Sequence, residues 1–83
     1  MQNLLNNLVD LERSLRSIGK TETADFIASL ISNLRSGNEN EIIKALNRMK
    51  GSASITQYAS FSNEQEALYY RILEDAWDIR KQF

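Results

Sequence analysis

Apolar residues recur along most of this chain at the three- and four-residue spacing of an α-helix. The recurrence predicts four helices, over about 3–18, 21–36, 39–50 and 63–82. Their expected core residues are Leu4, Leu8, Leu11, Leu15, Ile18, Phe26, Ile27, Leu30, Ile31, Leu34, Ile42, Ala45, Leu46, Met49, Leu68, Tyr69, Ile72, Leu73, Ala76, Ile79 and Phe83. The predicted fold is an all-α, small four-helix bundle that forms a single helical domain over 1–83.

Capping residues and glycines punctuate these helices. Thr21 is expected to cap the second helix, and Asn38 with Glu41 resembles a capping box for the third. The last helix has two overlapping possibilities, Asn63 with Glu66 or Ser62 with Gln65. The glycines at 19, 37 and 51 fall between helices, where a residue that tolerates positive φ is common.

The connection between the third and fourth helices has no helical period and, over 51–63, no charge. It nevertheless contains Ile55, Tyr58 and Phe61, whose exposure to water would be unfavourable. Two interpretations remain open: the long loop is tucked against the helices, or it is exposed for a partner.

Composition restricts the possible chemistry of the 83 residues. Cysteine and histidine are both absent, which excludes disulfides and thiolate metal sites and removes the most common general base and metal ligand. No acidic spacing matches a calcium loop and no glycine-rich segment matches a phosphate loop. An enzyme would need a carboxylate with a raised pKa, such as Glu12, or a metal held by carboxylates. Pairing with Arg16 is the simpler interpretation of Glu12. We expect no enzyme activity, catalytic residue, metal or cofactor.

Charge and hydropathy also bear on partners and location. The net charge is −1, and the basic residues are scattered among helix ends, so a nucleic-acid partner is not expected. The sequence begins without a signal-peptide pattern and has no apolar run long enough to span a bilayer. The expectation is a cytoplasmic protein without a membrane partner.

The last helix has one feature that neither core packing nor the helix dipole explains. Tyr70, Glu74, Trp77 and Lys81 follow one another at i, i+4, i+7 and i+11, at the edge of the apolar arc, and we call these four residues the aromatic ridge. Large amphipathic rings beside carboxylates are typical anchors of protein interfaces. The alternative is that Tyr70 and Trp77 form the floor on which the 51–63 segment rests.

A family resemblance indicates a class of partner for this feature. The run Met49-Lys50-Gly51-Ser52, a short polar loop, and a final helix that starts with Asn and Glu and contains Leu68, Tyr69 and Trp77 resemble small α-helical bacterial immunity proteins of contact-dependent growth inhibition (polymorphic toxin) systems. The resemblance covers mainly 24–80. It implies a cytoplasmic protein that neutralises one cognate toxin domain, in some systems a nuclease with a basic cleft, by stoichiometric binding. The residues expected to contact the partner are Tyr70, Glu74, Asp75, Trp77 and Asp78, with Tyr58 and Phe61 as secondary contacts.

A second class of function fits the same residues. The chain could be a helical adaptor or a homodimerisation module with no toxin partner, because its core is small and Ala24 and Ala28 offer a smooth side to a second copy.

Overall fold

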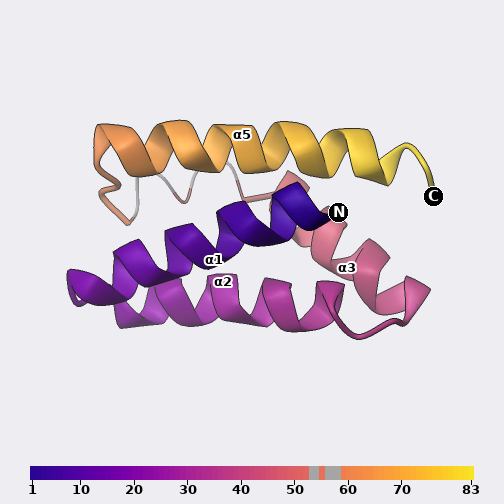
Figure 1. Cartoon of the computed structure of the whole chain (residues 1–83), viewed down its shortest axis with the longest axis horizontal. Coiled ribbons are helices and arrows are strands. Elements are labelled where there is room, and N and C mark those ends of the chain that lie inside the picture. The colour runs from indigo at the N-terminus through magenta and orange to yellow at the C-terminus, as the bar shows by residue number, and fades with distance from the viewer. Residues whose placement is uncertain (53–54, 56–58) are drawn as a thin grey trace.

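The structure of the chain, a computed structural model, describes residues 1–52, 55 and 59–83. Within this part the elements are α1 (Gln2–Ser17), α2 (Thr21–Leu34), α3 (Glu39–Lys50) and α5 (Asn63–Arg80), with no strand among them. The predicted all-α class, the four helices and the long connection before the last of them are therefore confirmed (Figure 1).

The helices pack around α1. It lies between α2 and α5, while α3 closes one end of the molecule and contacts both α2 and α5 (Figure 1). This arrangement brings the second half of α3 beside the second half of α5, although the long connection separates them in the sequence.

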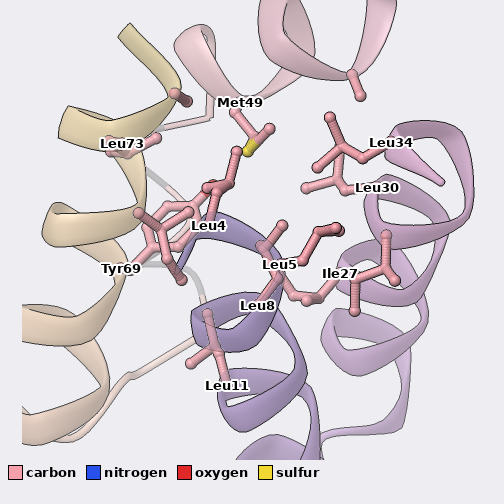
Figure 2. Packing of buried hydrophobic residues seen from close by; sticks show 14 of the residues in the cluster. Leu4, Leu5, Leu8, Leu11, Ile27, Leu30, Leu34, Met49, Tyr69 and Leu73 are labelled. Carbon is pink, nitrogen blue, oxygen red and sulfur yellow. The ribbon is translucent and has the colours of Figure 1, made fainter. Parts of the chain in front are cut away.

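The core is formed by the predicted stripes. Leu4, Leu8, Leu11 and Leu15 of α1 are completely buried. Figure 2 shows the side chains of α1 in the middle, with those of α2 on one side and those of α5 on the other. Other buried residues are Leu5, Ala24, Ile27, Leu30, Ile31, Leu34, Ala45, Leu46, Met49, Tyr69, Ile72, Leu73 and Ala76. Since Ala24 belongs to this core, the side expected to receive a second copy is partly occupied by the chain itself.

Two predicted core residues lie outside the core. Ile18 is 56% exposed because α1 ends at Ser17, and Phe83 is exposed because α5 ends at Arg80. In both cases the prediction continued the helical spacing past the last residue of the helix. The side chain beyond that residue does not lie on the buried stripe.

The helix starts confirm part of the capping prediction. The Asn38 side chain accepts hydrogen bonds from the backbone N–H groups of Asn40 and Glu41, at 2.9 and 3.3 Å. At α2 the prediction was wrong: the capping position is Lys20, with no side-chain cap, and Thr21 is already helical. At α5 the pair Ser62 and Gln65 forms the capping box.

Gln65 also links α5 to α1. Its Oε1 accepts the backbone N–H of Ser62 at 2.9 Å, and its Nε2 donates to Ser14 Oγ at 2.8 Å. Both polar ends of this buried side chain are thereby satisfied, which removes the cost of burying an amide.

The described residues of the long connection favour a tucked segment. Ile55 and Phe61 are half-buried against the core. Lys20 Nζ donates to the backbone carbonyls of Ala59 and Ser60, which fixes the end of the connection to the α1–α2 turn. Tyr58 lies outside the described residues.

No helix in the described part of the chain combines the length and apolar character needed to cross a membrane.

Candidate protein-binding surface on the last helix

The packing of α5 explains why the aromatic ridge faces outward. The helix buries Tyr69, Ile72, Leu73 and Ala76 against α1 and α3. Residues one position away from a buried stripe are turned by about 100° from it. The neighbouring Tyr70 and Trp77 consequently remain 48% and 47% exposed.

Phe61 does not rest on that ridge. Its ring meets the buried ring of Tyr69 edge-on, with centroids 5.8 Å apart and planes at 89°. The prediction that Tyr70 and Trp77 form the floor for Phe61 was therefore wrong, because the loop residue packs on the core side of α5. As a partner contact Phe61 is poorly placed, since only part of the ring is accessible.

Tyr69 is further tied to the start of the long connection. Ser52 Oγ donates to the backbone carbonyl of Met49 at 2.7 Å, and a further hydrogen bond joins the hydroxyls of Ser52 and Tyr69. Burial raises the pKa of the Tyr69 phenol above its ordinary value, and the hydrogen bond with Ser52 lowers it by less. This side chain serves the packing of the core.

Trp77 borders two chemically different surroundings. The Lys50 ammonium lies over the indole, 4.5 Å from the ring centroid. Trp77 also lines a hollow together with Glu74, Asp78 and Lys81. The structure thus gathers three of the predicted contact residues, Glu74, Trp77 and Asp78, around one hollow, with Tyr70 on the same side of the helix.

Asp75 belongs to the other edge of α5. It is half-buried and lines a hollow with Met1, Leu4 and Ile79, near the start of α1. Asp78 lines both this hollow and the hollow beside Trp77. Asp75 is therefore set apart from the aromatic ridge, although the sequence places it one residue after Glu74.

Two basic residues beside Trp77 were not predicted as part of this surface. Lys50 and Arg80 line a shallow depression between α3 and α5, and Arg80 Nε donates to Asn47 Oδ1 at 3.2 Å. Both residues lie at helix ends, where a positive charge suits the helix dipole. Because the dipole alone explains each charge, the sequence did not indicate that the two residues lie close together. We call this region the basic depression; its lining residues are Leu46, Lys50, Leu73, Ala76, Trp77 and Arg80.

Glu12, the carboxylate considered for catalysis, is part of an ion-pair network. Arg16 binds Glu12 at 2.8 Å and Asp25 at 2.9 Å. Both hydrogen bonds raise the pKa of the Arg16 guanidinium, and the bond with Glu12 contributes most. The network joins the outer sides of α1 and α2. Among the described residues, no group of three or more metal-ligating side chains is placed to hold an ion.

Comparisons of the chain with protein-family models, with curated proteins and with solved structures found no match.

Proposed function

We propose that this chain is a protein-binding domain that neutralises a cognate toxin domain by stoichiometric binding. The observation that carries the proposal is the exposure of Tyr70 and Trp77, close to one half each, on a helix whose other large apolar residues are mostly buried. The binding surface is the aromatic ridge together with Asp78.

The composition of this surface supports binding of a protein. Tyrosine and tryptophan bury a large area at low entropic cost and dominate the energetic centres of many interfaces. Glu74, Asp78 and Lys81 line a hollow beside Trp77, and although Lys81 pairs with Asp78 at 3.9 Å, one negative charge remains in excess. Carboxylates at the rim of an interface speed the encounter with a basic partner, such as the cleft of a nuclease.

The resemblance of Met49-Lys50-Gly51-Ser52 and of the last helix to immunity proteins supports the choice of a toxin as partner. Such a protein acts without chemistry of its own, by covering the active site or the substrate site of the toxin. This mode of action suits a chain without cysteine or histidine.

The proposal predicts that the gene immediately upstream encodes a toxin domain, and the direct test is co-expression of the chain with that domain. Cells that produce both proteins should grow, whereas cells that produce the toxin domain alone should not. If cells die as fast with this chain as without it, the toxin-neutralising function is wrong.

Two variants locate the activity on the surface. The double variant Tyr70→Ala and Trp77→Ala should lose protection. Ile18→Ala is the matched control, because Ile18 is as exposed and directly follows the last residue of α1, and that end of α1 lies at the opposite end of the molecule from the end of α5 (Figure 1). Equal protection by the two variants would place the binding surface elsewhere.

A further inference from the structure

The basic depression beside Trp77 has a chemistry that the proposed function does not use. Its floor is apolar, since Leu46, Leu73 and Ala76 are buried core residues of α3 and α5. Its walls are Trp77 and the two cations Lys50 and Arg80. A small apolar floor between two positive groups suits an apolar side chain that has a carboxylate beside it.

Both cations are held in position by contacts within the chain. Lys50 Nζ lies 4.5 Å from the centroid of the Trp77 ring, and Arg80 Nε donates to Asn47 Oδ1 at 3.2 Å. Side chains that are already oriented lose less entropy when they bind a ligand. The guanidinium of Arg80 keeps the fork geometry that suits a carboxylate.

No counter-charge accompanies these cations. In the described part of the chain neither Lys50 nor Arg80 forms an ion pair, and no acidic side chain lines the depression. The remaining residues, 53–54 and 56–58, contain no aspartate or glutamate. Two like charges beside one apolar depression repel each other, and an anionic ligand would relieve that repulsion.

We infer that the basic depression binds an acidic segment of the protein partner, with an apolar side chain on the floor and a neighbouring carboxylate between Lys50 and Arg80. The inference rests on the proposed function, because it assigns partner chemistry to one side of the Trp77 surface. Trp77 also lines a hollow with Glu74, Asp78 and Lys81, in which Lys81 pairs with Asp78 at 3.9 Å and one negative charge remains in excess. The basic depression and this hollow, which meet at Trp77, therefore differ in net charge.

The test is a selection of random peptides displayed on phage against the intact chain, followed by titration of synthetic peptides. Trp77 is the only tryptophan, so its fluorescence reports binding at this position if the peptides lack tryptophan. We expect the selected peptides to share a small apolar residue next to Asp or Glu, because the floor of the depression is small. Replacement of that acid by its amide should weaken binding by about tenfold or more, as expected for a charge-assisted contact.

Matched charge variants separate the depression from general electrostatics. Lys50→Gln with Arg80→Gln should weaken binding of the selected peptides by about tenfold or more. Lys44→Gln with Arg48→Gln removes the same charge from residues that do not line the depression, and should change affinity by less than about threefold.

Two results would overturn the inference. If peptides depend on Trp77 but show no acidic preference and bind both charge variants equally, the basic depression is not an acid-binding site, while the proposed binding surface stands. If calorimetry, which needs no tryptophan, shows that the selected peptides bind Trp77→Ala as tightly as the original chain, the peptides bind elsewhere and the inference is wrong, while the proposed surface is tested separately with the toxin domain.

Discussion

The ammonium of Lys50 lies over the ring of Trp77, 4.5 Å from its centroid, and joins the end of α3 to the exposed side of α5. A cation at this distance is attracted by the negative face of the indole. The contact fixes the orientation of a side chain that remains 47% exposed. Trp77 is in this way presented at the surface with limited freedom, as an interface anchor requires.

The contribution of this contact can be isolated by a double-mutant cycle of Lys50→Met and Trp77→Leu. We expect a coupling of about 0.5–1 kcal/mol in the free energy of unfolding, the range of cation–π contacts at exposed sites. Urea denaturation measures each variant. A parallel cycle of Lys44→Met with Trp77→Leu should give no coupling, because Lys44 instead pairs with Glu41 on the exposed side of α3. Equal coupling in both cycles would contradict the contact.

Gln65 should matter more for stability than its neighbour Glu66. Gln65→Ala removes the reciprocal bond of the capping box and leaves Ser14 without its donor, and we expect a loss of about 1–2 kcal/mol. Glu66→Ala is the control, since Glu66 would hold the equivalent role if Asn63 were the cap. Thermal or urea unfolding distinguishes the two, and a larger loss for Glu66→Ala would show that the helix begins one residue later.

The two glycines after α2 and α3 should respond differently to alanine. Gly37 has φ +74°, a backbone conformation that costs other residues about 1–2 kcal/mol, so Gly37→Ala should destabilise the chain by about that amount. Gly51 has φ −87°, and a Cβ there would meet only ordinary contacts at 3.9 Å. Gly51→Ala should be neutral or stabilising by about 0.5 kcal/mol. Equal losses in urea denaturation would contradict this difference.

Tyr69 should make stability fall at alkaline pH. Because its pKa is raised in the folded chain, the unfolded chain loses the phenolic proton first. The stabilisation is complete below the ordinary value of 10.0 and is lost as the pH rises through the raised value. Denaturation at about pH 8 and about pH 11 should show a smaller decline for Tyr69→Phe than for the original chain. An unchanged decline for Tyr69→Phe would contradict the linkage.

The sequence predicted the fold better than the surface. Helical spacing is a local property, so the stripes of α1 and α5 and the cap at Asn38 could be recognised from the chain alone. The cap of α5 remained ambiguous because two overlapping pairs, Ser62 with Gln65 and Asn63 with Glu66, satisfy the same pattern.

The surface could be predicted only in part, because it depends on how α3 lies against α5. Neighbours in the chain differ by about 100° around a helix, so Tyr69 became the partner of Phe61 while Tyr70 remained outside. Lys50 and Arg80 each had a sufficient local explanation at a helix end. Their meeting around Trp77 is a tertiary contact that helical spacing does not encode.

The most direct test of the proposed function is a calorimetric titration of the toxin domain that this function predicts in the gene immediately upstream, with the original chain and three single variants. Tyr70→Ala and Trp77→Ala should each weaken binding by about 2 kcal/mol or more, which corresponds to roughly a thirtyfold change in Kd. Ile18→Ala should bind like the original chain. If Trp77→Ala binds the toxin domain as tightly as the original chain does, the proposed binding surface on α5 is wrong.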